Sequence, residues 1–364
     1  MNLSNVSLVI LCWHLMFATV SACAQSNILT FENNKLDVSS ANAEVVQHMD
    51  REALLIRSGT VLLESVEFQD GTIEVDIAPT SSFAFAGLVF RAESADNLEE
   101  VYFRLNKSGL PDAVQYTPRY NAISAWQLYN GEGYTAATTF PITEWIHLKI
   151  KVQGKSAEIY IGRSEEPVLS STLVRKVEAG KIGLWGLVGA YFSNFQYTAA
   201  ESNAEVREPT GRVPANFLTD WEISQVFSAE SVDLETYPTD GKIKSLQWNP
   251  LSSDTTGLVN ISTLRHVNEA EGEGEVLVYA RTTITSDDDQ VKKLSFGYSD
   301  EISIFLNGRL LFLGNSRWRS RDIGFNGIVG LNDHLYLDLK EGENELLFAV
   351  TEWFGGWGYM AKLE

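Results

Sequence analysis

Short runs of alternating apolar and polar residues, each closed by a turn residue, recur along nearly the whole chain. The runs WIHLKIKV (residues 145–152) and SAEIYIG (residues 156–162) show the pattern, and the turn Gln153-Gly154-Lys155 joins them. Because successive side chains of a strand point to opposite faces, this alternation predicts half-buried antiparallel strands and hairpins. Long stretches of helix-forming residues at helical spacing are absent. We therefore expect an all-β protein with two β-sandwich (jelly-roll) domains in tandem after a signal peptide.

Further strands follow from the same pattern. In the first half of the chain we expect them at residues 83–91, 100–105, 113–118, 124–129, 181–187 and 190–197. In the second half we expect them at residues 274–285, 290–299, 301–314, 334–339 and 345–353. The segment 301–314 contains Asn307-Gly308 between two apolar runs, which is typical of a two-residue hairpin turn with positive φ.

The best domain boundary is a charged segment that lacks aromatic residues until Phe217. It contains two prolines and separates the two sets of strands. The expected organisation is a signal peptide at 1–24, a first β-sandwich at 25–199, a linker at 200–215 and a second β-sandwich at 216–364.

The amino terminus carries an apolar run of 13 residues, 8–20, which is too short to span a bilayer comfortably and fits a signal peptide. Cleavage after Ala24 would leave Gln25 first, and we favour this simple secretion. The alternative is a lipobox ending at Cys23, which would leave a lipid anchor on that cysteine. Cys12 leaves with the signal in either case, so no disulfide is expected in the mature chain. The expected location is secreted, periplasmic or at the cell surface, in a bacterium, without a transmembrane segment.

The net charge of −20 disfavours nucleic acid as a partner. The nucleophile-elbow, zinc-protease, P-loop and dinucleotide motifs are absent from the sequence, and the five histidines lie far apart. No cofactor is therefore expected. Acidic stretches at 268–275 and 287–289 are interpreted as solvated loops, with a calcium site as the alternative.

The stretch GTIEVDIAP (residues 71–79) places two carboxylates, Glu74 and Asp76, on one face of a predicted strand. A retaining glycosidase needs two carboxyl groups about 5–5.5 Å apart, one as nucleophile and one as acid. If this strand were catalytic, the acid would have to come from another strand, for example Glu93 or Glu99. We interpret it instead as a structural strand with a wet face, which ends at Pro79 or lies at a sheet edge.

Two clusters of aromatic residues are candidates for ligand binding. Flat rings stack on the apolar face of a sugar ring, while amides and arginines bind its hydroxyl groups. The alternative is that alternate rings belong to the cores. The candidate ligand-binding residues are Tyr116, Arg119, Tyr120, Trp126, Tyr129 and, in the C-terminal stretch WFGGWGYM, Trp357.

An arginine-rich loop follows the Asn-Gly hairpin. Arg317, Arg319 and Arg321 flank Trp318 in a chain that is otherwise strongly acidic. The loop could bind an acidic ligand or pair with the chain's own carboxylates.

The first half resembles the concanavalin A-like lectin/glucanase superfamily, which includes laminin-G-like and pentraxin-like sandwiches. The residues that carry the resemblance are GTIEVDI, AGLVFR, GKIGLWG and AYFSNFQY at 71–77, 86–91, 180–186 and 190–197. Glucanases of this superfamily carry Glu-x-Asp-x-x-Glu or Glu-x-Asp-x-Glu, in which the last Glu is the acid. Ala78 and Pro79 stand at those positions here, and neither can donate a proton.

The second half resembles the galactose-binding-like jelly roll that accompanies many glycoside hydrolases as a sugar-binding domain. FGYSDEISIFLNGRLLFLG and LKEGENELLFAV, residues 296–314 and 339–350, carry this resemblance.

Together the patterns and the resemblances imply a secreted, non-catalytic carbohydrate-binding protein whose partner is a glycan or polysaccharide. One alternative is a glycoside hydrolase that uses Glu74 and Asp76 with an acid from another strand. The other is a protein-interaction or adhesion module.

Overall fold

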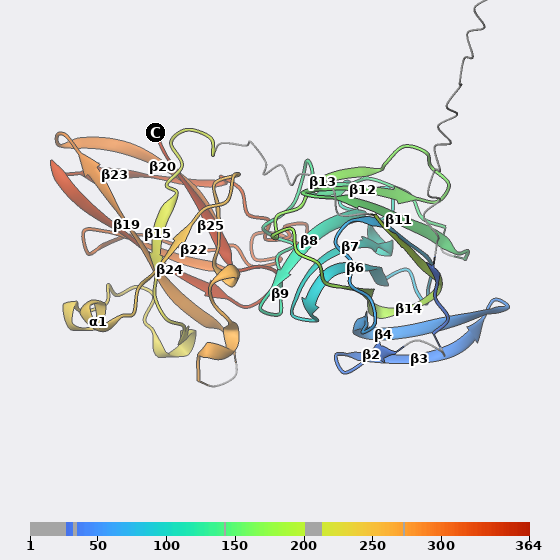
Figure 1. The fold of residues 1–364 in the computed structure, drawn as a ribbon. Helices are drawn as coiled ribbons and strands as arrows, with labels where there is room; N and C mark the ends of the chain where they lie inside the picture. The colour runs from blue at the N-terminus through green and yellow to red at the C-terminus, as the bar shows by residue number, and fades with distance from the viewer. Residues whose placement is uncertain (1–26, 32–34, 142, 201–212, 272–273) are drawn as a thin grey trace, which may run out of the picture.

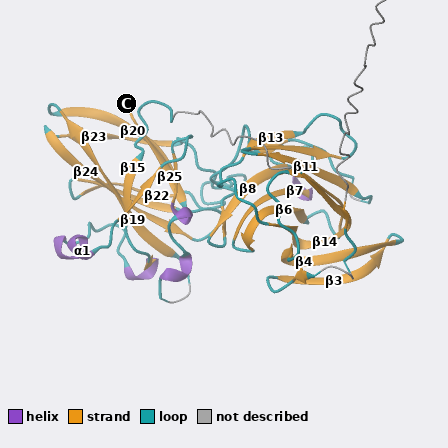
Figure 2. Cartoon of the chain, in the orientation of Figure 1, coloured by secondary structure: helices purple, strands orange, loops and turns teal. Residues whose placement is uncertain are grey.

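The computed structural model describes residues 27–31, 35–141, 143–200, 213–271 and 274–364. The expected signal peptide, Cys23 and most of the expected linker lie outside these residues. The described chain is almost entirely β-structure, with antiparallel pairing throughout, and the predicted all-β sandwich class is confirmed (Figures 1 and 2). Strands β1 to β14 form one sheet and β15 to β25 form two others. We call residues 27–200 the N-terminal unit and residues 213–364 the C-terminal unit.

The N-terminal unit is a single curled sheet in which β14 is the central strand. Its strands are β1 Asn27–Ile28, β2 Leu36–Asp37, β3 Ala41–His48, β4 Arg51–Leu63, β5 Gly71–Pro79, β6 Phe85–Ser94, β7 Asn97–Arg104, β8 Val114–Tyr120, β9 Ile123–Ser124, β10 Thr135–Ala136, β11 Ile146–Gln153, β12 Ser156–Ile161, β13 Leu169–Thr172 and β14 Lys181–Ala199. A short 3₁₀ helix, Leu105–Lys107, follows β7.

The long strand β14 bends in the middle and so joins two leaves of the sheet. Before the bend it pairs with β6, and after the bend it pairs with β5, while β4 follows its other edge across both parts. The register shifts between Leu187 and Ala190, where Val188 and Gly189 have φ of 66° and 91°. The hydroxyl of Thr80 donates to the carbonyl oxygens of both residues, at 2.9 and 2.8 Å. This bulge turns one strand from one leaf into the other.

The leaves β6-β7-β8 and β5-β11-β12 enclose one hydrophobic core. Ile73, Val75 and Ile77 of β5 are fully buried in it, while Glu74 and Asp76 point to the opposite face. The expected wet face is thus confirmed. β5 does end at Pro79, but it lies between β14 and β11, so the alternative of an edge strand is wrong.

The C-terminal unit packs a seven-stranded sheet, β17-β15-β19-β24-β21-β22 with β16, against a four-stranded sheet, β18-β25-β20-β23. Its strands are β15 Asp220–Ile223, β16 Phe227–Ser228, β17 Asn249–Ser252, β18 Leu258–Asn260, β19 Val276–Ser286, β20 Gln290–Ser299, β21 Glu301–Leu306, β22 Arg309–Asn315, β23 Asp333–Leu339, β24 Gly342–Glu352 and β25 Gly358–Leu363. The helical segments are α1 Asp240–Ser245 and the 3₁₀ turns Ala229–Ser231, Ile261–Thr263 and Val267–Glu269.

Aromatic side chains fill the space between these two sheets. The rings of Trp221 and Phe348 lie 4.8 Å apart, and Tyr359 contacts both edge-on. Trp357 is fully buried in the same core, and its indole N–H donates to the carbonyl oxygen of Val350. Asn307 and Gly308 have φ of 50° and 79°, which confirms the tight hairpin between β21 and β22.

One expected strand is wrong. Residues 124–129 continue β9 only as far as Ser124, and then form a turn. Alternation suggested a strand there, but the apolar residues of the turn pack against the C-terminal unit instead. Ala125, Leu128 and Tyr129 form a cluster with Leu258 and Val329.

The same turn holds the two units together through hydrogen bonds. The main-chain N–H of Gln127 donates to the carbonyl oxygen of Gly355 at 3.0 Å, and its carbonyl oxygen accepts from the N–H of Val329. Its side-chain amide donates to the carbonyl oxygen of Asn326 at 2.7 Å. Because Gln127 is completely buried, these bonds fix how the units meet.

Candidate ligand-binding cleft

A cleft of about 700 Å³ lies where the two units meet. Aromatic, charged and amide side chains from both units line it. They include Tyr102, Arg104, Asn106, Lys107, Asp112, Trp126 and Trp185 of the N-terminal unit, and Trp318, Arg319, Asn326, Glu352, Trp353 and Phe354 of the C-terminal unit. We call this site the interdomain cleft.

Exposed aromatic rings are the most prominent feature of the interdomain cleft. Trp353, Phe354 and Trp318 are 56, 47 and 38% exposed, which is unusual for side chains of this size. Phe354 contacts all of its aromatic neighbours edge-on, with ring centroids 5.8 Å from Trp126, 5.9 Å from Trp353 and 6.3 Å from Trp318. The cluster thus joins the two units and presents apolar faces to the cleft.

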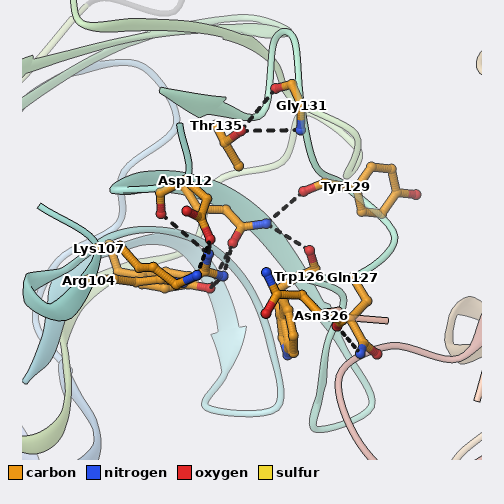
Figure 3. A network of polar contacts seen from close by, with 11 residues as sticks. Arg104, Lys107, Asp112, Trp126, Gln127, Tyr129, Gly131, Thr135 and Asn326 are labelled. Atoms are coloured by element: carbon orange, nitrogen blue, oxygen red, sulfur yellow. Dashed lines mark hydrogen bonds and ion pairs between the residues drawn. The ribbon is translucent and has the colours of Figure 1, made fainter. Parts of the chain in front are cut away.

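A polar network fixes the N-terminal wall of the interdomain cleft. The guanidinium of Arg104 donates to a carboxylate oxygen of Asp112 at 3.0 Å and to the Tyr102 hydroxyl at 2.9 Å. It also lies over the ring of Trp126, 5.3 Å from the centroid. Lys107 approaches the same oxygen of Asp112 at 3.4 Å. Figure 3 labels Arg104, Lys107, Asp112 and Trp126 and shows the bond between Gln127 and Asn326. Trp126 therefore contacts both Arg104 and Phe354 before any ligand arrives.

A buried carboxyl group forms part of the opposite wall. Glu352, the last residue of β24, lines the interdomain cleft but is only 6% exposed, and in the part of the chain that the structure describes its Oε2 atom has no hydrogen-bond partner. Burial raises the pKa of Glu352 well above its usual range, and the nearby carboxyl of Asp300 raises it further. A neutral carboxylic acid at this position can donate a hydrogen bond into the cleft.

Asp300 lies behind this wall and binds the main chain of the exposed aromatic residues Trp353 and Phe354. Its Oδ2 atom accepts hydrogen bonds from the main-chain N–H groups of Trp353 at 2.6 Å and Phe354 at 2.8 Å. Burial raises the pKa of Asp300 to about 6, although these hydrogen bonds oppose the shift.

Of the six residues expected to bind ligand, only Trp126 lines the interdomain cleft. Tyr116 and Trp357 are corrected to core residues because both are completely buried. The Tyr116 hydroxyl donates to Glu99 at 2.5 Å, so the ring faces no solvent.

The other three expected residues have structural partners. The Tyr129 ring is buried, and its hydroxyl donates to Asp254 of the C-terminal unit at 3.2 Å. Arg119 pairs with Glu100 at 2.7 Å. Tyr120 lies beneath the guanidinium of Arg175.

The expected alternative catalytic strand carries an ion-paired cluster instead of a free acid. His147 of β11 lies between the two carboxylates, with Nδ1 2.8 Å from Asp76 and Nε2 3.2 Å from Glu74. Arg51 and Asn194 also donate to Asp76, at 2.8 and 2.7 Å. Burial by itself would raise the pKa of Asp76, but these hydrogen bonds together lower it.

Glu93 and Glu99 are the acids considered as proton donors for a catalytic β5, and both interact with other side chains. Glu99 is completely buried and accepts from Tyr116, while Glu93 accepts from Arg175 at 2.7 Å. Both of these acids therefore interact with other side chains of the N-terminal unit.

No group of three or more His, Cys, Asp or Glu side chains in the described residues could hold a metal ion. In the two acidic segments, Glu275 pairs with Arg317, and Asp289 pairs with Lys340 at 3.2 Å. Calcium binding stays a prediction. In the part of the chain that the structure describes, no helix is long and apolar enough to cross a membrane.

Sequence reasoning missed Tyr102, Arg104, Trp185 and Glu352 as residues of the cleft. The first three lie within strands β7 and β14, where their positions fit the ordinary alternation of inward and outward side chains. Glu352 reads as the polar end of a strand. The aromatic stretch at 353–357, the arginine-rich loop and Trp126 of the first aromatic cluster gave the signals that pointed to this site.

No protein-family model and no curated protein sequence matches the chain. Among solved structures, a carbohydrate-binding module from Bacillus subtilis is similar at 19% identity and a TM-score of 0.37, covering 46% of this chain and 98% of its own. A Bacillus subtilis protein of unknown function with a galectin-like fold matches at 13% identity and a TM-score of 0.35, covering 49 and 91%. A β-glucanase from Bacillus licheniformis matches at 13% identity and a TM-score of 0.33, covering 46 and 92%. At scores this low, the similarities say nothing about which ligand this chain binds.

Proposed function

We propose that this protein binds a glycan in the interdomain cleft without cleaving it. The observation that carries the proposal is the cluster of Trp126, Trp318, Trp353 and Phe354, whose rings are contributed by both units and partly open to solvent. A sugar ring has an apolar C–H face that packs on such rings and hydroxyl groups that need hydrogen-bond partners.

The polar side chains of the same cleft provide those partners. Asn106 and Asn326 line it with amide groups, and Arg104 and Lys107 line it with donors. The Arg104 network is formed in the free protein, so little ordering is required when a ligand binds.

Binding without hydrolysis fits the carboxyl groups of the interdomain cleft. Asp112 is engaged by both Arg104 and Lys107, and Glu352 is buried. A retaining hydrolase needs one carboxylate free to attack the sugar, and neither group is presented that way. We further propose that the protein is exported, on the basis of the apolar run at 8–20.

The test compares Trp126→Ala and Phe354→Ala with Tyr336→Ala, an exposed aromatic on β23 outside the cleft. Residues 25–364 would be run in affinity gels containing neutral and acidic polysaccharides, with reducing ends assayed in the same wells. We expect retention on at least one polysaccharide, loss of about tenfold in affinity in the two cleft variants, and no change in the control.

Three results would contradict the proposal. Release of reducing ends would show an enzyme, and retention unaffected by the cleft variants would place the glycan elsewhere. No retention on any polysaccharide would favour a protein partner for the exposed aromatic cluster.

A further inference from the structure

The charge of the interdomain cleft is opposite to that of the whole protein. The chain has 48 acidic and 28 basic residues, yet the charged side chains that line the cleft are Arg104, Lys107, Arg319, Asp112 and Glu352. Three of these five are cations, and burial raises the pKa of Glu352 well above its usual range, which favours its neutral form. The cleft is therefore a cationic site in an acidic protein, which neutral sugars do not require.

Arg319 differs from the two other arginines of its loop. Arg317 pairs with Glu275, and Arg321 pairs with Asp333. Within the described residues, Arg319 has no carboxylate partner, and its guanidinium lies over the Trp318 ring, 4.1 Å from the centroid. It is exposed at the mouth of the cleft, where a stacked guanidinium can still bind an anion through its edge.

Glu352 is compatible with an anionic ligand only in its neutral form. Glu352 is a lining residue of the cleft, and its buried Oε2 atom has no hydrogen-bond partner among the described residues. A neutral carboxyl therefore has a hydrogen-bond donor available for a ligand oxygen. An ionised Glu352 would repel an anion at the same place. The unpartnered acid and the unpaired arginine thus favour the same class of ligand.

We propose that the interdomain cleft selects an acidic glycan, one that carries carboxylate or sulfate groups, with Arg319 as the cationic contact and Glu352 as a hydrogen-bond donor. This inference rests on the glycan-binding function proposed above. Because the protein as a whole carries a charge of −20, general electrostatic attraction would not bring a polyanion to it.

The first experiment uses matched ligands. Affinity would be measured for dextran and dextran sulfate, and for galactan and polygalacturonate, at low salt. We expect the acidic member of at least one pair to bind about tenfold more tightly, and the pair that shows the preference distinguishes sulfate from carboxylate. Raising the salt concentration should reduce the preference.

The second experiment uses matched variants. Arg319→Gln is expected to remove most of the preference for the acidic glycan, about five- to tenfold. The control is Arg309→Gln, which removes the same charge from an exposed arginine outside the cleft and is expected to leave the preference unchanged. Neutral glycans that bind as tightly as acidic ones, or an unchanged preference in Arg319→Gln, would overturn the inference while the proposed function stands. Failure of every polysaccharide to bind would instead overturn the proposed function.

The role of Glu352 is tested by the pH dependence of binding. Asp300, between β20 and β21, and Glu275, before β19, are the charged groups that act on Glu352. Glu301 and Arg317 interact with Glu275, and the charged residues that line the same cleft are Arg104, Lys107, Asp112 and Arg319. Glu352→Gln keeps a donor but cannot ionise, and all the other groups are unchanged. We expect affinity for the acidic glycan to fall with rising pH in the native protein and to fall less in the variant. Identical pH profiles with intact thermal melts would overturn this role.

Discussion

The side-chain oxygen of Gln127 accepts a hydrogen bond from the hydroxyl of Ser299 at 2.9 Å, although 172 positions separate the two residues. The donor ends strand β20 of the C-terminal unit, and the acceptor lies in a turn of the N-terminal unit. Both side chains are fully buried. The turn that carries Gln127 also carries Trp126, so the contact between the units and the aromatic wall of the cleft are built by the same few residues.

Gln127→Ala is expected to weaken the contact between the units. The substitution removes the acceptor of the Ser299 hydroxyl, which keeps only its longer contact with Asp300 at 3.3 Å, and it removes the donor to the carbonyl oxygen of Asn326. Each lost hydrogen bond costs about 0.5–1.5 kcal/mol. We expect a lower melting temperature in calorimetry and weaker glycan binding. Gln47→Ala, at an exposed position of β3, is the control. Unchanged melting of Gln127→Ala would show that the Gln127 side chain does not hold the units together.

Asp300 is expected to make stability depend on pH. Its pKa of about 6 in the folded protein lies above its usual value of 3.8, so the folded state retains a proton that the unfolded chain loses. The free energy of unfolding should therefore fall as pH rises from about 4 to about 6, by at most about 3 kcal/mol.

Asp300→Asn should reduce this fall, because the amide oxygen can still accept from Trp353 and Phe354 but cannot ionise. Denaturant unfolding of the native protein and of Asp300→Asn at a series of pH values measures this difference. Glu352 also makes the free energy of unfolding fall with rising pH, and it does so in both the native protein and Asp300→Asn. Equal slopes in the two proteins would show that Asp300 does not titrate in this range.

His147 is expected to stabilise the outer face of β5 in its charged form. The hydrogen bond to Asp76, and then the charges of Asp76 and Glu74, raise the pKa of His147 above its usual 6.5. Its contribution is present below pH 6.5 and is lost as pH rises through the folded pKa. Because the side chain is about one-third exposed, we expect less than about 1 kcal/mol.

His147→Gln should therefore lower the melting temperature more at pH 5 than at pH 9. His334→Gln, at an exposed histidine of β23, is the matched control. A larger loss at pH 9 would reverse the assigned sign.

Gly189 is expected to be required at the bend of β14. Its φ is +91°, and an added Cβ atom would lie 2.6 Å from the Thr80 hydroxyl oxygen. Gly189→Ala should therefore cost about 1–3 kcal/mol in unfolding measurements. Gly241→Ala in α1, where no atom lies within 4 Å of the added Cβ, should be neutral or slightly stabilising. Similar stability for the two variants would contradict the strain at the bend.

Local features of the fold could be predicted from the sequence. Ile73, Val75 and Ile77 alternate with Glu74 and Asp76, and the structure buries the first set and leaves the second half-buried on the opposite face, because a strand has only two faces. The positive φ of Asn307 and Gly308 follows from residue type in the same way. The sequence alone thus determined the all-β class and the faces of its strands.

The tertiary structure decided where the rings go. Tyr116, Trp126 and Tyr129 lie within 14 residues of one another, yet one is core, one lines the interdomain cleft and one packs between the units. Trp353 and Trp357 are separated by four residues and have opposite exposure. The alternation of apolar and polar residues does not distinguish a ring that packs on its own sheet from a ring that packs on the other unit. That difference depends on how the two units pack, because the cleft exists only where side chains far apart in the sequence, such as Arg104 and Glu352, are brought to the same surface.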